Sequence, residues 1–189
     1  MSTSKKVLRT LVVLGLLGAL AAVGAFSAFS SETSNPGNQI TAGTVALVDN
    51  DSDQALYNLP NAKPGDSATR CIRVTYNGSL PADVRIYRPD PVGALAAHVN
   101  LTITPGSGVA QDCSDFSADA GGPVFNNLLQ SLPTTYAGGV VDYPGAGSVW
   151  STGNAVTYRF VATLDVNAPN SAQGATTGVH AIRWEARNQ

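Results

Sequence analysis

Two long stretches of the chain alternate apolar and polar residues, the pattern of a β-strand with one buried face. In residues 68–76, Ile72, Val74 and Tyr76 share one side, and Cys71, Arg73 and Thr75 share the other. Residues 156–164 repeat the pattern. Their inward side chains are predicted to be Val156, Tyr158, Phe160, Ala162 and Leu164. A period of two over this length favours half-buried strands over helices.

Shorter strands are predicted where β-prone residues lie between turn residues. Their predicted ranges are 39–48 with a break at Gly43, 84–87, 101–103 and 179–187. Asn77-Gly78 indicates a tight turn, Pro89 and Pro91 end the second of these strands, and Pro105 and Gly106 end the third. In the last strand, His180, Ile182, Trp184 and Ala186 share one face.

One stretch, residues 123–132, has the spacing of a helix. Pro123 suits a first helical turn, and four apolar residues follow at helical intervals, namely Phe125, Leu128, Leu129 and Leu132. The predicted fold class is therefore all-β, an antiparallel β-sandwich of jelly-roll type with one short helix.

The first residues of the chain have the three-part pattern of a secretory signal peptide. Lys5, Lys6 and Arg9 precede an apolar run from Leu11 to Phe26 that is rich in glycine and alanine, and small residues follow. We predict residues 1–27 to be the signal peptide, with signal peptidase cutting between Ser27 and Ala28. The protein is then secreted, extracellular or at the cell surface, and touches the membrane only through an uncleaved signal segment. The alternative is a permanent membrane anchor.

The charge balance argues against nucleic acid as a partner. The formal net charge is −2, and removal of residues 1–27 takes three basic residues with it, leaving about −5. Nucleic acid binding requires a basic surface, and the sequence shows none. The remaining length suits one domain, predicted at residues 40–189.

Cys71 and Cys113 are the two cysteines of the chain. An even number of cysteines in an exported protein suggests a disulfide, which would pin the loop 111–122 to the strand that carries Cys71. The alternative is two free thiols.

Beyond these features, the order of motifs resembles that of the TasA/camelysin family of exported bacterial proteins, with a SipW-type signal peptide. Phe29 lies near the predicted mature terminus, and the strand ITAGTVAL follows at residues 40–47. Next come Asn58-Leu59, residues 63–67 with the sequence KPGDS, and residues 77–80 with NGSL. Pro64, Gly65 and Asp66 also make sense as a plain turn, and we read them as structural.

The resemblance implies a jelly-roll subunit that polymerises into biofilm-matrix fibres by donating its amino-terminal segment to a neighbour. Residues 28–39, which begin with Ala28, Phe29, Ser30 and Ser31, are the expected donor, because they are polar, contain Pro36 and have one apolar anchor. The partner is then a second copy, joined head to tail. The alternatives are a disordered tail for this segment, and for the protein a monomeric cell-surface binding or adhesion domain.

Catalytic and metal chemistry receive little support from the sequence. Camelysins have been described as metalloproteases, but His98 and His180 belong to no H-E-x-x-H motif, and a catalytic zinc takes three protein ligands. Asp49, Asp51 and Asp53 are weak calcium candidates, since the glycine and glutamate of a calcium loop do not follow. We therefore expect no enzyme activity, no catalytic residues and no cofactor.

Overall fold

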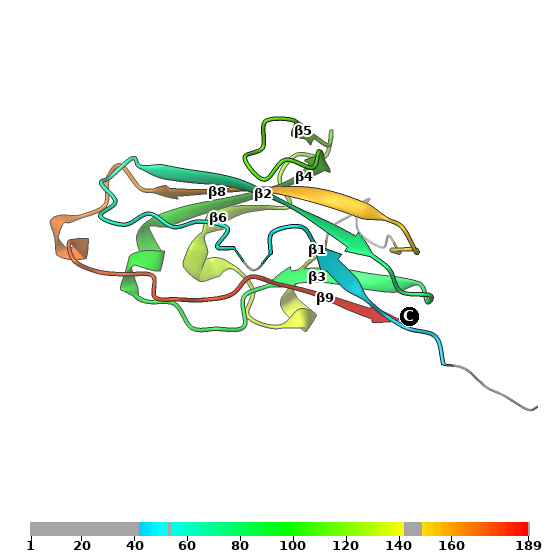
Figure 1. Cartoon of the computed structure of the whole chain (residues 1–189). Helices are drawn as coiled ribbons and strands as arrows, with labels where there is room; N and C mark the ends of the chain where they lie inside the picture. The colour runs from blue at the N-terminus through cyan, green and yellow to red at the C-terminus, as the bar shows by residue number, and fades with distance from the viewer. Residues whose placement is uncertain (1–41, 53, 142–148, 189) are drawn as a thin grey trace, which may run out of the picture. The chain divides into compact units, whose positions relative to one another are not determined.

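The computed structural model describes residues 42–52, 54–141 and 149–188 (Figure 1). The predicted signal peptide, the Ser27–Ala28 cleavage site, the donor segment 28–39 and Asp53 lie outside these ranges. Residues 42–189 form one compact unit. Within the described ranges, no helix has both the length and the apolar character needed to cross a membrane.

Two long antiparallel strands form the centre of the larger sheet. β2 (Ser67–Tyr76) pairs with β8 (Ala155–Leu164) over nearly its whole length, with Val74 opposite Val156. The inward side chains of both strands are buried as their alternation predicts: Ile72, Val74, Tyr76, Val156, Tyr158, Phe160, Ala162 and Leu164. Their burial confirms the prediction of two half-buried strands.

The remaining strands of the described residues complete two sheets (Figure 1). The larger has the order β1-β2-β8-β4-β5, with β6 also paired to β4, and the smaller has the order β7-β3-β9. The bounds are β1 Leu47–Asp49, β3 Ala82–Tyr87, β4 Val99–Ser107, β5 Ser117–Ala118, β6 Phe125–Leu128, β7 Val140–Val141 and β9 Arg183–Asn188. Short 3-10 turns connect them at η1 Ala94–His98, η2 Leu129–Ser131, η3 Tyr136–Gly138 and η4 Asn170–Ala172.

The hydrophobic core lies between the two sheets. Trp184 of β9 packs against Tyr158 and Phe160 of β8, with ring centroids 5.6 and 5.8 Å apart. Val84 and Ile86 of β3 belong to the same buried cluster. The antiparallel, all-β fold class is thus confirmed, whereas the jelly-roll connectivity stays a prediction.

The predicted helix at residues 123–132 is wrong. Residues 125–128 are instead a strand, β6, whose register places Phe125 opposite Ile103 and Leu128 opposite Asn100 of β4. Two of the four apolar residues at helical spacing, Leu129 and Leu132, still reach the core and are buried around the single turn of η2. Pairing with a strand distant in sequence overrides the local spacing.

The Asn77-Gly78 pair does not form a hairpin. β2 and β3 belong to different sheets, so residues 77–81 carry the chain across the sandwich. The backbone N–H groups of Asn77 and Ser79 donate to the carbonyls of Ala46 and Thr44. The partner of this turn is therefore the segment before β1, rather than its own flanking strands.

Three predicted strand boundaries also need correction. β4 continues through Pro105 to Ser107. The Pro105 carbonyl accepts the Asp119 backbone N–H, so the side of Pro105 that lacks an N–H faces away from β8, and pairing with β8 is not interrupted. In the described part of the range 39–48, strand geometry begins only at Leu47, and β9 begins at Arg183 rather than at residue 179.

Candidate functional site

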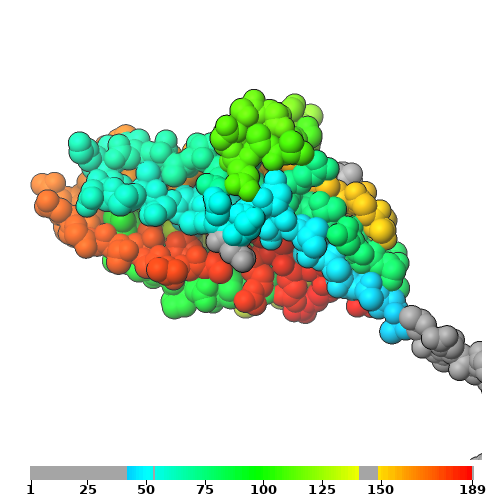
Figure 2. Space-filling view, in the orientation of Figure 1, coloured from blue at the N-terminus to red at the C-terminus, as the bar shows by residue number. Residues whose placement is uncertain are grey.

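An open groove of about 1530 Å³ runs along one side of the sandwich. Two segments without regular secondary structure over most of their length flank it. The first rim, residues 54–64, follows β1, and the second rim, residues 172–182, precedes β9. Figure 2 shows the two rims side by side, in cyan and in orange to red.

The floor of the groove is apolar, because it consists of inward side chains of the larger sheet. Ile72 and Val74 come from β2, and Ala162 and Leu164 come from β8. Leu56 and Ala62 of the first rim and Ile182 of the second pack against the same core. The groove therefore opens directly onto the hydrophobic core.

The rims offer backbone hydrogen-bonding groups. Residues 55–62 and 179–182 make no backbone–backbone hydrogen bond with any other described residue. β9, which continues the second rim, pairs with β3 on one side and is the edge of its sheet in the described structure. An edge strand presents a row of N–H and C=O groups to any extended segment beside it.

Tyr57 and His180 join the two rims. The Tyr57 hydroxyl lies 2.5 Å from Nε2 of His180, and the ring centroids are 5.6 Å apart. Burial raises the pKa of Tyr57, and the nearby Arg88 partly offsets that rise. Tyr57 is accordingly a neutral hydrogen-bond partner at physiological pH.

A tight turn ends the first rim and starts β2. Gly65 has a φ of 93°, and the Asp66 carboxylate accepts the Lys63 backbone N–H at 2.8 Å. The Gly65 N–H donates to the carbonyl of Leu164, so the turn is tied to the end of β8. Pro64, Gly65 and Asp66 act as the structural turn predicted from the sequence.

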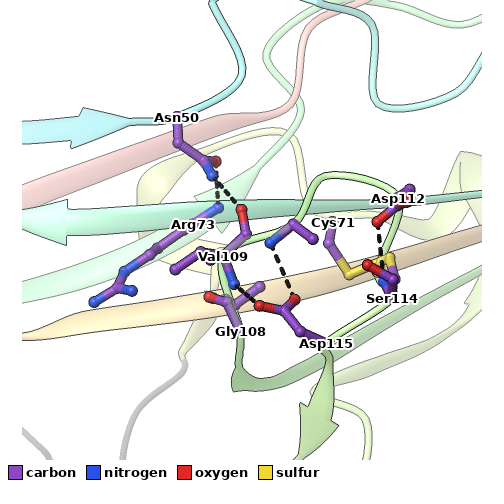
Figure 3. The surroundings of a disulfide bond; sticks show 11 residues. Asn50, Cys71, Arg73, Gly108, Val109, Asp112, Ser114 and Asp115 are labelled. Atoms are coloured by element: carbon purple, nitrogen blue, oxygen red, sulfur yellow. Dashed lines mark hydrogen bonds between the residues drawn. A yellow bond between two sulfur atoms is a disulfide. The ribbon is translucent and has the colours of Figure 1, made fainter.

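A disulfide-pinned loop, residues 107–119, covers the outer side of the larger sheet (Figure 3). Cys71 of β2 and Cys113 are bonded, with their Cα atoms 5.2 Å apart, which confirms the predicted bridge. Asp115 accepts the backbone N–H groups of Val109 and Ala110, and these bonds lower the pKa of its carboxyl.

This loop also caps the edge of β2. The Cys71 N–H donates to the Gln111 carbonyl at 2.9 Å, and the Arg73 N–H donates to Oδ1 of Asn50 at 2.8 Å. Asn50 in turn donates from Nδ2 to the carbonyl of Val109. The part of β2 that β1 does not pair with is thus partly capped, whereas β9 has no strand hydrogen-bonded to its second side among the described residues, although β1 packs near it.

The acidic run after β1 does not gather as a metal site in the described residues. Oδ1 of Asp49 accepts the Asp51 backbone N–H at 3.3 Å, Asp51 is buried, and Asp53 lies outside the described ranges. No group of three His, Cys, Asp or Glu side chains suited to a metal occurs there, and His98 ends η1. Calcium binding by Asp49, Asp51 and Asp53 stays an untested prediction.

Sequence reasoning missed Tyr57 and misplaced His180. Tyr57 lies in an irregular segment with no apolar period, next to Asn58-Leu59, so no local pattern marks it. The sequence predicts His180 on a strand face, but the residue lies before β9 and contacts Tyr57 across the groove. The contact joins residues far apart in sequence, and only the fold brings them together.

The described residues thus define an antiparallel β-sandwich with an open apolar groove and a disulfide-pinned loop. Residues 3–87 match the family described as camelysin metallo-endopeptidase. Over this part of its length the chain is similar to that family, in agreement with the resemblance to the TasA/camelysin family that its motifs predict. The matched range ends with β3. No curated protein matches the chain, and the SipW type of the signal peptide stays a prediction.

Proposed function

We propose that the protein is an exported structural subunit that polymerises by strand donation, with residues 28–39 of one copy entering the groove of the next. The observation that carries this proposal is the groove itself. It opens onto the core and runs beside the edge strand β9, and residues 55–62 and 179–182 of its rims make no backbone–backbone hydrogen bond with other described residues.

The size of the groove favours an extended peptide as its occupant. Pockets for small ligands usually measure about 300–1,000 Å³, less than the 1530 Å³ found here. An inserted strand satisfies backbone groups through its main chain and fills apolar positions with alternate side chains. Trp184, which lines the groove, supports this use, because its buried indole N–H has no partner among the described residues.

The two sheets differ in how their edges are protected. The Asn50 side chain and the Gln111 carbonyl already occupy N–H groups of β2. The groove side of β9 has no hydrogen-bonded strand in the described residues. We therefore place the donated strand against β9, with the floor of β2 and β8 below it.

The donor segment has the chemistry that such a strand needs. It is polar apart from Phe29, so it cannot form a core by itself, and Phe29 supplies one apolar anchor for the groove. Donation from one copy to the next is a heterologous contact that does not close, and it therefore produces filaments. Extracellular or cell-surface fibres, such as those of a biofilm matrix, are the expected product.

The name of the matching family refers to a metallo-endopeptidase. A catalytic zinc takes three protein ligands, and the described residues bring no such set together. They do not fit that metal, so the proposal includes no peptidase step. The second candidate is a monomeric surface domain that binds another partner in the same groove.

Deleting residues 28–39, with the signal peptide kept, should leave a folded monomer that forms no filaments by electron microscopy. The described core includes none of these residues, so circular dichroism and the melting temperature should change little. A peptide of residues 28–39 added to the truncated protein should raise its melting temperature. The matched control is the same peptide with Phe29 replaced by serine, which should give a smaller rise. Filaments from the truncated protein would disprove strand donation by this segment.

A further inference from the structure

We propose that Tyr57 and His180 form a latch that ties the two rims of the groove together in the free subunit and must open before a donor strand can enter. This inference rests on the proposed function, since it concerns access to the same groove. In this proposal Tyr57 and His180, neither of which belongs to a predicted motif, control the rate of assembly.

The hydrogen bonds around His180 determine which group donates and which accepts in the Tyr57–His180 bond. Nδ1 lies 3.0 Å from the Gly178 carbonyl, which can only accept, so Nδ1 carries a proton. In the neutral ring Nε2 is then an acceptor, and the Tyr57 hydroxyl donates to it across 2.5 Å. The bond to Gly178 also fixes the orientation of the imidazole, so that Nε2 faces the first rim.

The position of the pair makes it an obstacle to insertion. Tyr57 belongs to the first rim and His180 to the second, and both line the groove. An extended segment that pairs with β9 and reaches the floor must pass between the rims where the two rings meet. Because residues 55–62 make no backbone–backbone hydrogen bond with other described residues, this side-chain bond is a main polar tie of the first rim.

The second rim is anchored on the side away from Tyr57. The Ala181 N–H donates to the Asp90 carboxylate at 2.9 Å, and the Gly93 N–H donates to the Thr177 carbonyl at 2.8 Å. Opening the latch can therefore leave the second rim in place while the first rim moves. A closed latch also shields the edge of β9 from indiscriminate pairing before assembly.

Tyr57→Phe in the exported protein tests the latch, because it keeps the ring and removes only the hydroxyl. The matched control is Tyr136→Phe, which removes a hydroxyl bonded to the Asp83 carbonyl at 3.0 Å, outside the groove lining. Hydrogen exchange of the amides of residues 55–62 is measured on monomer, and the rate of filament growth is measured separately. A lost hydrogen bond corresponds to about 2- to 12-fold faster exchange, and filament growth should rise within the same range.

The two readouts separate the latch from strand donation. Faster exchange and faster growth in Tyr57→Phe alone, with Tyr136→Phe unchanged, support the latch. Unchanged exchange, or faster exchange with unchanged filament growth, overturns it while leaving strand donation standing. If neither the original protein nor the variant forms filaments, strand donation fails, and the exchange result alone decides whether the bond holds the rims together. His180→Ala should reproduce the Tyr57→Phe result, and a slower-growing His180→Ala would contradict the latch.

Discussion

Replacing both Cys71 and Cys113 with alanine is expected to lower the free energy of unfolding by about 4 kcal/mol. The bridge joins residues 42 positions apart, and in the chain-entropy account a closed loop of that length restricts the unfolded chain by this amount. Chemical denaturation of the original protein and of the double variant measures the difference.

The native loop has other contacts that should keep it in place without the bridge. Thr157 donates to the Gly108 carbonyl, and the guanidinium of Arg159 lies 4.8 Å from the centre of the Phe116 ring. The loss of stability should therefore arise mainly because the unfolded chain has more conformational freedom without the bridge. As controls, reductant should destabilise the original protein by a similar amount and leave the double variant unchanged. A difference below about 1 kcal/mol would contradict this account.

Phe160→Ala is expected to lower the free energy of unfolding by about 3–5 kcal/mol. Phe160 is fully buried on β8 and meets Trp184 of the opposite sheet edge-on, with the ring planes at 74°. Its removal leaves a cavity between the two sheets, at the contact that joins them. Equilibrium unfolding in urea measures the loss.

The neighbouring residue supplies the control for this substitution. Val161 lies on the same strand, but its side chain points to the other face and is only half-buried. Val161→Ala should cost no more than about 1 kcal/mol. Equal losses for the two variants would mean that the inward face of β8 does not form the core.

The parts of the fold that the sequence predicts correctly are those with a long, regular pattern. β2 and β8 each alternate over many residues, and a shift by one position would expose every apolar side chain. The turn at Pro64, Gly65 and Asp66 is also predictable, because each residue has its own local conformational preference. In these places local preference and the final fold agree.

The errors arise where a partner distant in sequence decides the structure. Residues 125–128 become a strand because β4 accepts them, although their apolar spacing suits a helix. Asn77-Gly78 has the sequence of a hairpin turn, but the N–H groups of Asn77 and Ser79 bond to the segment before β1. Pro105 continues a strand because its position needs no N–H toward β8.

The candidate site, like the fold, is predictable from the sequence only in part. The sequence predicts the disulfide, which the structure confirms, and the donor segment, which lies outside the described residues and stays a prediction. It does not predict the groove, because the rims have no regular period and the floor uses residues that the sequence assigns to the core. The Tyr57–His180 contact depends on the placing of two irregular segments, and no spacing in the sequence encodes that placement.

The most direct test of strand donation determines where residue 29 lies in the assembled material. Phe29 is replaced by a photoreactive benzoylphenylalanine, and subunits labelled with ¹⁵N are mixed with unlabelled subunits before assembly and irradiation. We predict cross-links between differently labelled chains, from residue 29 to groove residues such as Val74, Ala162 or Trp184. Cross-links confined to the residue's own chain, or to the outer face of the larger sheet around the 107–119 loop, would contradict the account.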